Sequence, residues 1–544
     1  MADLKDQLQA QVKGEVLDDV TTLAICSHDA SIFESKPQVV VAPKDTEDIE
    51  KLVQFVTSHN PQLSLTARSA GTDMSGGAVN DSITLDMTKH FNRVLKVGED
   101  FAVTQPGVHY RDFEAETLKH HLLLPCYPAS RELCTVGGMA ANNSAGEKTL
   151  SMGQTKKYVK KIKAVLSDGK EYTFEPLNKV QLQKKLAQKD FEGEIYRKVH
   201  KLIEANYDLI QKARPTVHKN SSGYLLWDVW DRKTFDISKL LVGSQGTLGI
   251  ITEIEFRLIQ PKAYSNLLVI FLKDLKNVGE IVNKVLTHQP ESFESFDDYT
   301  LRVAMRFLPE VIKVFKPHGL ISLLVQFLPE VWMSLTGGIP KLILIAEFTG
   351  DSKEEVERKC LEAQKDLSSF KVKTRITKSE DEARKYWVLR RESFNLLRHH
   401  SMGLRTAPFI DDIIVKPEFL PEFLPKLQTL LEEYKLVYTI AGHIGDGNFH
   451  IIPLMNFKDP QTREIIPELS SKVYKLVFEY HGSMSAEHND GLVRGPYLLQ
   501  MFGEKVSQLF KDVKRIFDPQ DIFNPHKKAD ADLQYSLAHI VHTS

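Results

Sequence analysis

Cysteine is scarce in this chain of 544 residues: there are four, Cys26, Cys126, Cys134 and Cys360, and they are widely separated. No Cys-x-x-Cys pair is present, so this chain alone can build neither a zinc ribbon nor a ferredoxin-type iron–sulfur cluster. If the protein transfers electrons onward, the acceptor has to come from outside these residues.

An excess of either charge is also missing, because 70 Lys and Arg face 72 Asp and Glu, for a net charge of −2. Nucleic-acid-binding proteins usually carry a basic patch, so we predict no nucleic-acid partner. The first residues mix both charges without an apolar core, so no secretory signal is expected and the cytoplasm is the predicted compartment. The length predicts at least two domains.

Long apolar runs are interrupted in the most hydrophobic segment, residues 300–340. An apolar helical stripe occurs there, but several prolines cut it into pieces too short to span a bilayer. Two interpretations stay open. The segment is a helical insertion packed on the core, or it is a docking face for a partner subunit or for the inner face of the cytoplasmic membrane.

Strand and helix patterns alternate along the chain. Residues 39–43 predict a strand, and Ile49, Leu52, Val53 and Val56 follow at helical spacing. The other predicted segments before Pro261 are strands at 63–66, 82–86 and 102–107, a hairpin at 161–174, helices at 178–214, and a strand, a glycine turn and a strand at 239–258. After Pro261, strands at 266–272 and 341–348 alternate with helices at 352–366 and 418–433. This pattern indicates a separate α+β domain on an antiparallel sheet.

Glycine-rich loops stand in place of the common nucleotide-binding motifs. Neither G-x-G-x-x-G nor G-x-x-x-x-G-K-[ST] occurs. Instead, glycines and small residues cluster at 68–77, 128–146 and 243–252. Glycine permits positive φ and lets backbone N–H groups approach phosphate oxygens. One such loop is usually a plain turn, but three in one half of the chain predict an extended diphosphate ligand.

The segment GHIGDGNFHIIP, residues 442–453, carries two histidines around an Asp446-Gly447 dipeptide. That dipeptide favours a two-residue type I′ hairpin, which would place His443 directly opposite His450. Opposed Cβ atoms lie roughly 5 Å apart, within reach of one metal ion, and Glu487 is a candidate third ligand. Taken alone, the H-x6-H spacing is more typical of an ordinary surface hairpin with two scattered histidines, and the metal site depends on the rest of the chain.

The three loops resemble the flavin-binding loops of FAD-linked oxidases of the vanillyl-alcohol oxidase and p-cresol methylhydroxylase type. The residues that match the family pattern are Arg68, Gly71, Thr72, Ser75, Gly76 and Gly77, then Pro128, Ser130, Thr135, Gly137, Gly138, Asn143 and Gly146, then Gly243, Ser244, Gly246, Thr247, Leu248 and Gly249. Gln245 stands where glutamate is usual. Similarity continues through the histidine hairpin, SAEH at 485–488 and DPQDIFNP at 518–525. Within this family the chain is similar to the D-2-hydroxy acid dehydrogenases, which include D-lactate, glycolate and D-2-hydroxyglutarate enzymes.

The resemblance implies an α+β fold, with a two-subdomain PCMH-type FAD-binding domain and a ferredoxin-like antiparallel-sheet cap domain that holds the substrate. The implied boundaries are 1–35 for a helical N-terminal extension, 36–260 for the FAD domain, 261–489 for the cap with its insertion near 300–340, 490–530 for a return to the FAD domain, and 531–544 for a tail. The implied flavin contacts are Arg68, Ser69, Ala70, Gly71, Thr72, Asp73, Ser75, Pro128, Thr135, Gly137, Gly138, Asn142, Ala145, Gly146, Gly249, Ile251 and Asn524. Because Ser69-Ala70-Gly71 offers no histidine, the FAD is expected to be noncovalent.

By the same resemblance, the reaction is oxidation of a D-2-hydroxy acid to the 2-keto acid, with hydride transfer to flavin N5. A divalent metal (zinc, manganese or iron) is expected on His443, His450 and Glu487, with His488 as general base and Arg390 on the substrate carboxylate. Glu487 and His488 are adjacent, so both can face the site only if the backbone bends there. Asn489 stands where glycine is usual, and asparagine tolerates the left-handed conformation.

Three positions that correspond to polar substrate contacts in the D-2-hydroxyglutarate enzymes are apolar here: Phe394, Ile410 and Ile452. They favour D-lactate or a longer apolar 2-hydroxy acid, because an unpaired second carboxylate is costly to bury. The electron acceptor is expected to be a quinone, an iron–sulfur subunit or a small redox protein. Two alternatives remain: the alkyl-transferring flavoenzyme of ether-lipid synthesis on the same fold, and a redox-inactive flavin subunit of a larger complex.

Overall fold

A computed structural model describes residues 3–59, 61–298, 340–399 and 404–542, without the side chains of 392–399. The predicted insertion near 300–340, with its proposed membrane or partner contact, lies outside these residues apart from Pro340. Among the described residues, no helix combines the length and the apolar character needed to cross a bilayer.

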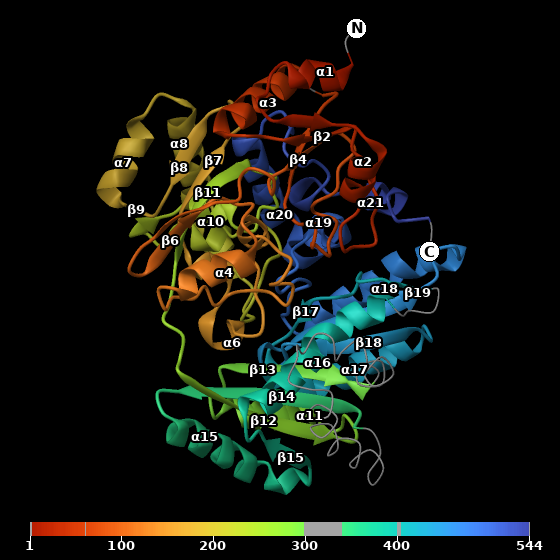
Figure 1. The fold of residues 1–544 in the computed structure, drawn as a ribbon. Coiled ribbons are helices and arrows are strands. Elements are labelled where there is room, and N and C mark those ends of the chain that lie inside the picture. The colour runs from red at the N-terminus through yellow and green to blue at the C-terminus, as the bar shows by residue number, and fades with distance from the viewer. Residues whose placement is uncertain (1–2, 60, 299–339, 400–403, 543–544) are drawn as a thin grey trace.

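A four-stranded sheet opens the fold (Figure 1). Its strands, in spatial order, are β1 (Glu15–Leu17), β2 (Val39–Ala42), β4 (Ile83–Asp86) and β3 (Leu65–Arg68). The last three are parallel and β1 runs antiparallel to β2. The predicted strand–helix unit is confirmed, because helix α3 (Thr46–Ser58) begins at the Asp45 cap and buries the four predicted apolar residues. A helical extension was expected for residues 1–35. The described part of this segment contains β1 as well as the helices α1 (Leu4–Gln9) and α2 (Val20–Cys26).

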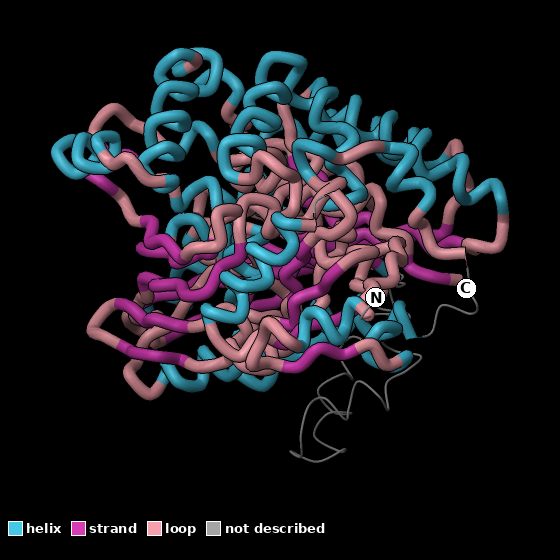
Figure 2. Tube along the Cα trace, turned by 90° about the horizontal axis from the view of Figure 1, so that it is seen from above, coloured by secondary structure: helices cyan, strands magenta, loops and turns pink. Residues whose placement is uncertain are grey.

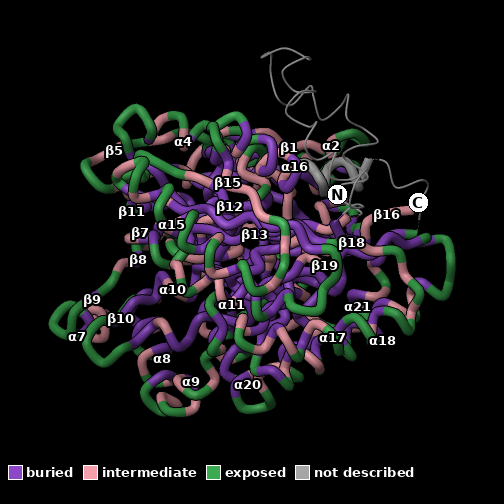
Figure 3. Tube along the Cα trace, turned by 90° about the horizontal axis from the view of Figure 1, so that it is seen from below, coloured by how far each residue is buried: buried purple, intermediate pink, exposed green. Residues whose placement is uncertain are grey.

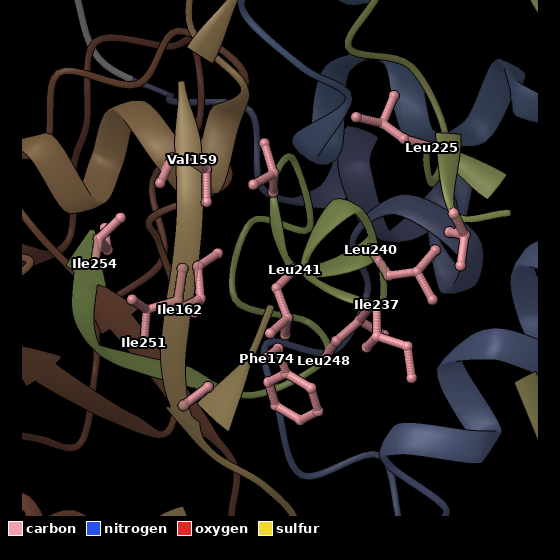
Figure 4. Close-up of a cluster of buried hydrophobic side chains, with 14 of the residues drawn as sticks. Val159, Ile162, Phe174, Leu225, Ile237, Leu240, Leu241, Leu248, Ile251 and Ile254 are labelled. Atoms are coloured by element: carbon pink, nitrogen blue, oxygen red, sulfur yellow. The ribbon is translucent and has the colours of Figure 1, made fainter. Parts of the chain in front are cut away.

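A five-stranded antiparallel sheet lies beside the first one. Its order is β5 (Val94–Val97), β6 (Phe101–Thr104), β11 (Ile250–Arg257), β7 (Val159–Val165) and β8 (Glu171–Phe174). The predicted β7–β8 hairpin is confirmed, and Gly169 at its turn has a φ of 72°. The prediction of a strand that begins at residue 239 is wrong. Asp236 accepts a hydrogen bond from the Ser238 amide, 3.0 Å away, and the short helix α10 (Ser238–Leu241) follows. Leu240 and Leu241 of this helix point in different directions within the same hydrophobic core (Figure 4).

Helices cover these two sheets, mostly as predicted for residues 178–214. They are α4 (Tyr110–Leu118), α5 (Val136–Asn142), α6 (Thr149–Met152), η1 (Thr155–Lys157), α7 (Lys179–Ala187), α8 (Phe191–Ala205), α9 (Tyr207–Ala213) and η2 (Leu226–Asp228). A two-stranded ribbon of β9 (Leu177–Asn178) and β10 (Thr234–Phe235) lies beside α7.

An eight-stranded antiparallel sheet forms the second half, as expected for the cap (Figure 1, lower part). Its strands are, in order, β15 (Lys373–Ile376), β12 (Tyr264–Leu272), β14 (Leu342–Gly350), β13 (Ser292–Asp297), β18 (Val437–Gly442), β19 (Asn448–Met455) and β16 (Arg405–Thr406), with β17 (Ile413–Ile414) also on β19. The helices of this half are α11 (Val278–Leu286), α15 (Lys353–Asp366), η3 (Ser368–Phe370), α16 (Glu380–His399), η4 (Pro417–Phe419), α17 (Leu420–Glu432) and α18 (Pro460–Glu479). Strand β12 is buried on both faces, which explains its unbroken apolar run: Leu268 joins the core with α11 and α15, while Phe271 meets Tyr386 of α16.

The chain after Asp490 returns to the first half (Figure 1). Its elements are α19 (Gly491–Arg494), η6 (Gly495–Tyr497), α20 (Leu498–Phe517), η7 (Lys528–Asp530) and α21 (Leu533–Ala538). Phe510 of α20 belongs to the core around the five-stranded sheet, and Phe523 belongs to the core of the four-stranded sheet. Strands run through the middle of the molecule (Figure 2), where buried residues concentrate (Figure 3). The chain thus crosses between the two halves twice, once after β11 and once near Asp490, and the glycine-rich loops lie where the halves meet.

Candidate functional site

A cavity of about 920 Å³ lies between the glycine loops and the eight-stranded sheet. This volume is at the upper end of the roughly 300–1,000 Å³ typical of ligand pockets. The predicted flavin contacts that line it are Ser69, Ala70, Gly71, Thr72, Asp73, Pro128, Thr135, Gly137, Gly138, Asn142, Ala145, Gly249 and Ile251. Gly246 also lines it, with a φ of +70°, and a Cβ there would meet no atom within 4 Å. The loops therefore leave open space where an extended cofactor such as FAD fits.

Four predicted flavin contacts do not line the cavity: Arg68, Ser75, Gly146 and Asn524. The Arg68 guanidinium instead donates to the carbonyls of Ile25, His28 and Ala78, which ties the first loop to the N-terminal segment. Asn524 accepts from Thr66 and donates to the carbonyls of Gly77 and Gln245. A Cβ at Gly146 would lie 2.0 Å from the Tyr127 carbonyl oxygen. These residues hold the loops together. They therefore support the wall of the cavity and do not line it.

Gln245, the residue that departs from the family pattern, links three segments through its amide. Its Nε2 donates to Ser75 Oγ at 2.9 Å, and its Oε1 accepts from the Gly491 amide at 2.8 Å. Ser75 Oγ itself donates to Asp73 Oδ2 at 2.8 Å, so it needs a donor on its other side. An amide satisfies both neighbours at once, whereas a carboxylate has no hydrogen to offer Ser75.

We expect Gln245→Glu to weaken FAD binding roughly 10-fold to 100-fold at neutral pH, because an unmade buried hydrogen bond costs about 1–3 kcal/mol and a second carboxylate would face Asp73. Fluorescence quenching of FAD added to the apoprotein measures this affinity. Gln181→Glu is the matched control, since Gln181 caps an exposed helix start with its oxygen alone. Equal FAD affinity in parent and Gln245→Glu would show that the amide polarity is immaterial.

The histidine hairpin differs from the predicted type I′ turn. His450 pairs with Ala441, and the connection contains the 3₁₀ turn η5 (Ile444–Asp446), followed by Gly447 with a φ of 74°. The prediction of direct opposition between the two histidines is therefore wrong in register. Asp446 explains the difference, because it is buried and paired with His218 and Lys219, so tertiary contacts decide the loop. The two imidazoles still lie with ring centroids 5.3 Å apart.

Asp412 bends the chain at the SAEH segment. Its Oδ2 accepts hydrogen bonds from the backbone amides of Glu487 and His488, at 2.8 and 2.7 Å, and from Ser485 Oγ. Two consecutive amides aimed at one oxygen turn both following side chains to the same side. Asn489 then adopts a φ of 68°, which confirms the left-handed conformation expected for this position. The adjacent Glu487 and His488 accordingly face one site.

Three imidazoles converge on a single carboxylate oxygen. Glu487 Oε1 lies 2.9 Å from His443 Nε2, 3.5 Å from His450 Nε2 and 4.0 Å from His488 Nε2. The opposite ring nitrogens are held by buried carboxylates: His443 Nδ1 by Glu294 at 2.7 Å, and the Nδ1 atoms of His450 and His488 by Asp411 at 2.9 and 2.6 Å. Each Nδ1 is thus a donor, and each Nε2 faces Glu487, where either a proton or a metal ion would lie between the nitrogen and the carboxylate oxygen.

The charges around these imidazoles shift their pKa values. Burial lowers the pKa of His443, but the carboxylates of Glu294 and Glu487 outweigh it and raise that pKa to about 9. Burial also opposes ionisation of Glu487, yet His443 and Lys219 hold its pKa well below its usual range. For His450 and His488 burial is again outweighed, here chiefly by Asp411, so both pKa values are raised. The cluster therefore attracts positive charge.

A divalent cation fits this donor set. The buried carboxylates of the cluster are Glu294, Asp411, Asp412, Asp446 and Glu487, and its permanent cations are Lys219, Arg390 and Arg494. Five negative charges and three positive ones leave an excess of two negative charges, which one divalent cation would neutralise. Imidazole Nε2 and carboxylate oxygen, with carboxylates behind the imidazoles, are what zinc and similar metals take in proteins.

Not every acid near the site is free to bind an ion. Asp412, His450, Glu487 and His488 form a group whose ligand atoms lie within 4.8 Å of one another among the described residues. However, Asp412 Oδ2 already accepts three hydrogen bonds, so its role is to shape the turn. His443, with its Nε2 nearest to Glu487, is the better third donor beside His450.

Helix α16 supplies the cationic side of the cavity. Arg390 lines the cavity, and its guanidinium lies 3.3 Å from Oε2 of Glu294, the same carboxylate whose Oε1 holds His443. The neighbouring Arg391 forms a bidentate pair with Glu147. Both arginines therefore lie at the cavity wall.

Several residues of the site were missed at the level of sequence: Glu294, Asp411, Asp412 and Lys219. The only local signal was the Asp411-Asp412 dipeptide after an apolar stretch, where two buried acids are unusual. Glu294 and Lys219 are far from the histidines in sequence and carried no signal. His488, His450 and Glu487 line the cavity as predicted, while His443 lies behind them.

Comparison with known proteins gives the family. Residues 261–528 match the family described as FAD linked oxidases, C-terminal domain, and residues 37–175 match the FAD binding domain. The chain belongs to the FAD-linked oxidases.

Relatives of known name include two kinds of D-2-hydroxy acid enzyme. A D-2-hydroxyglutarate dehydrogenase of Pseudomonas putida is 26% identical over 95% of this chain and 50% of its own length, so the chain spans about half of that relative. A D-lactate dehydrogenase of Archaeoglobus fulgidus is 26% identical over 90% of both chains. Among solved structures, 4-ethylphenol oxidase from Gulosibacter chungangensis has a TM-score of 0.69 at 15% identity, covering 96% of each chain, which shows a shared fold. The predicted PCMH-type fold is confirmed.

Proposed function

We propose that the protein oxidises a D-2-hydroxy acid to the 2-keto acid with noncovalent FAD and a divalent metal ion, zinc being the first candidate and manganese or iron the others. The supporting observation is that the Nε2 atoms of His443, His450 and His488 converge on Glu487 Oε1 at the wall of the flavin cavity. A purely structural cluster has no need of three imidazoles whose outer nitrogens are all held as donors.

The flavin would accept the Cα hydrogen as hydride, and the ion would lower the pKa of the substrate hydroxyl. The ion would be held by His443, His450 and Glu487. His488 would take the hydroxyl proton on Nε2, because Asp411 keeps the proton on its Nδ1. Arg390 would bind the substrate carboxylate, for which its forked guanidinium is suited.

The cavity wall supports a small or apolar substrate side chain. Ile452 lines the cavity beside His450, together with Ala441 and Val388. Ile410 is buried but does not line it, and the Phe394 side chain lies outside the described residues. D-lactate or a longer apolar 2-hydroxy acid is therefore the proposed substrate class. Arg384, an exposed residue of the lining, is the cation that a second carboxylate would meet if D-2-hydroxyglutarate were preferred.

Electrons would pass to an external quinone, iron–sulfur subunit or small redox protein. The alkyl-transferring alternative needs no metal, and the redox-inactive alternative needs neither Arg390 nor the base. Both are disfavoured by the intact donor set at the cavity wall. Metal analysis of the purified protein separates the first alternative from a dehydrogenase.

Anaerobic mixing with a panel of D-2-hydroxy acids tests the proposal. We expect D-lactate or D-2-hydroxybutyrate to bleach the flavin absorbance near 450 nm, with kcat/KM at least about tenfold above that for D-2-hydroxyglutarate. Prior treatment with a chelator is expected to abolish bleaching, and added Zn²⁺ or Mn²⁺ to restore it. L-enantiomers serve as controls. Bleaching that is indifferent to the chelator would remove the metal from the proposal, and no bleaching by any acid would remove the oxidation itself.

A further inference from the structure

Lys219 is a wholly buried cation that the proposed chemistry does not use. It belongs to the segment between α9 and η2, in the first half of the chain. Its Nζ lies 2.8 Å from Glu487 Oε2 and 3.5 Å from Asp446 Oδ2. It therefore connects the turn of the histidine hairpin to the glutamate of the SAEH segment.

The backbone around Lys219 is fixed to the SAEH segment. The Ser221 amide donates to the Ser485 carbonyl at 3.0 Å, and Ser483 Oγ donates to Asn220 Oδ1 at 2.7 Å. The Asn220 amide donates to Gln154 Oε1 at 2.9 Å. Because these hydrogen bonds are short and buried, they fix the position of the Lys219 ammonium relative to Glu487.

The two oxygens of Glu487 consequently have separate partners. Oε2 accepts from Lys219, while Oε1 faces the three Nε2 atoms. A carboxylate whose second oxygen is occupied by an ammonium group offers one oxygen to a metal ion. Without that ammonium both oxygens could bind the ion, as glutamate does in bidentate sites. Catalytic metal sites differ from structural ones in keeping positions open for substrate.

We propose that Lys219 is a positioning residue that keeps Glu487 monodentate and so reserves metal positions for the hydroxyl and carboxylate oxygens of the substrate. This inference rests on the proposed function. It assigns to Lys219 an effect on substrate binding, and not on retention of the metal. Removal of the ammonium also removes a positive charge near the ion, which favours metal binding.

The test uses FAD-loaded Lys219→Met, which keeps the length of the side chain, and Lys219→Gln, which keeps one donor for Oε2. Zn²⁺ affinity is measured by competition with a chromophoric chelator. Affinity for pyruvate, a 2-keto acid that does not reduce the flavin, is measured from the perturbed flavin spectrum of the Zn²⁺-loaded protein. Lys156→Met is the matched control, because Lys156 pairs with Asp228 at 2.6 Å and does not contact the cluster.

We expect Lys219→Met to bind Zn²⁺ as tightly as the parent or up to tenfold tighter, and to bind pyruvate at least tenfold more weakly. Lys219→Gln should lie between it and the parent. A tenfold loss of Zn²⁺ affinity would show that Lys219 merely supports the donor set, and unchanged pyruvate affinity would show that it reserves nothing. If Lys219→Met fails to retain FAD, Lys219→Gln decides between these outcomes. If the parent protein itself binds no Zn²⁺, the result overturns the proposed function and not only the role of Lys219.

Discussion

Asp411→Asn is expected to lower the rate of flavin reduction by roughly 10²- to 10⁴-fold, the range associated with loss of a correctly protonated general base. One carboxylate accepts from Nδ1 of both His450 and His488. An asparagine offers one oxygen and one NH₂, so only one imidazole keeps a proton on Nδ1. The other must accept there, and its proton moves to Nε2, facing Glu487. Either a metal donor or the base is then lost.

Stopped-flow mixing under anaerobic conditions measures this rate directly, and the flavin spectrum reports whether FAD is retained. Asp236→Asn is a matched control, because Asp236 is also buried and accepts from Ser238, but belongs to the turn before α10. Within the described part of the chain, Asp411 is hydrogen-bonded to His450, His488 and Arg494 and to no residue of the three glycine-rich loops, so FAD occupancy should stay near that of the parent. A rate within about fivefold of the parent would contradict the orienting role of Asp411.

The regular elements could be predicted from the sequence because their signals are local. Ile49, Leu52, Val53 and Val56 repeat at helical spacing and all four are buried on α3. The Asp168-Gly169 turn likewise joins two strands as expected. In these cases neighbouring residues in the sequence decide the structure, and tertiary contacts agree with them.

Prediction failed where a distant partner outweighs the local preference. Asp446-Gly447 favours a type I′ turn, but burial of Asp446 beside Lys219 selects a 3₁₀ turn and shifts the register of the hairpin. The failure at residue 239 has a local cause instead: the stretch favours a strand, but Asp236, two residues before Ser238, accepts its amide hydrogen and a helical turn begins there. Neither competing partner can be inferred from periodicity.

The candidate site shows the same division. The histidines and Glu487 lie in short recognisable segments, so the sequence was sufficient to propose them. The groups that orient them come from elsewhere: Glu294 from β13, Asp411 from the loop before β17, and Lys219 from the first half of the chain. Orientation of a ring requires a partner at one particular nitrogen, and only the folded arrangement provides it.

Glu487→Gln is expected to reduce metal affinity by about a thousandfold and to abolish metal-dependent flavin reduction at micromolar Zn²⁺. Two unit charges 4 Å apart interact by about 4 kcal/mol at an effective dielectric constant near 20, which is about a thousandfold in an equilibrium constant. The amide oxygen of the variant also accepts a weaker hydrogen bond from the Lys219 ammonium, because the 2.8 Å bond of the parent joins two opposite charges and the new one does not. With one carboxylate fewer, the cluster has an excess of one negative charge instead of two. A single proton on His443 then neutralises it without a metal ion.

Titration of the chelator-treated protein with Zn²⁺ measures the affinity, and bleaching by the preferred D-2-hydroxy acid in the same samples measures the chemistry. Glu192→Gln is the matched control: Glu192 is another buried glutamate with a lysine partner, Lys185, and it belongs to α8, away from the cluster. High Zn²⁺ concentrations should partly restore flavin reduction in Glu487→Gln, because His443 and His450 remain. Zn²⁺ affinity equal to that of the parent would mean that the imidazoles converge on Glu487 for a reason other than a metal ion, and the excess negative charge of the cluster would then have to be neutralised by protons alone.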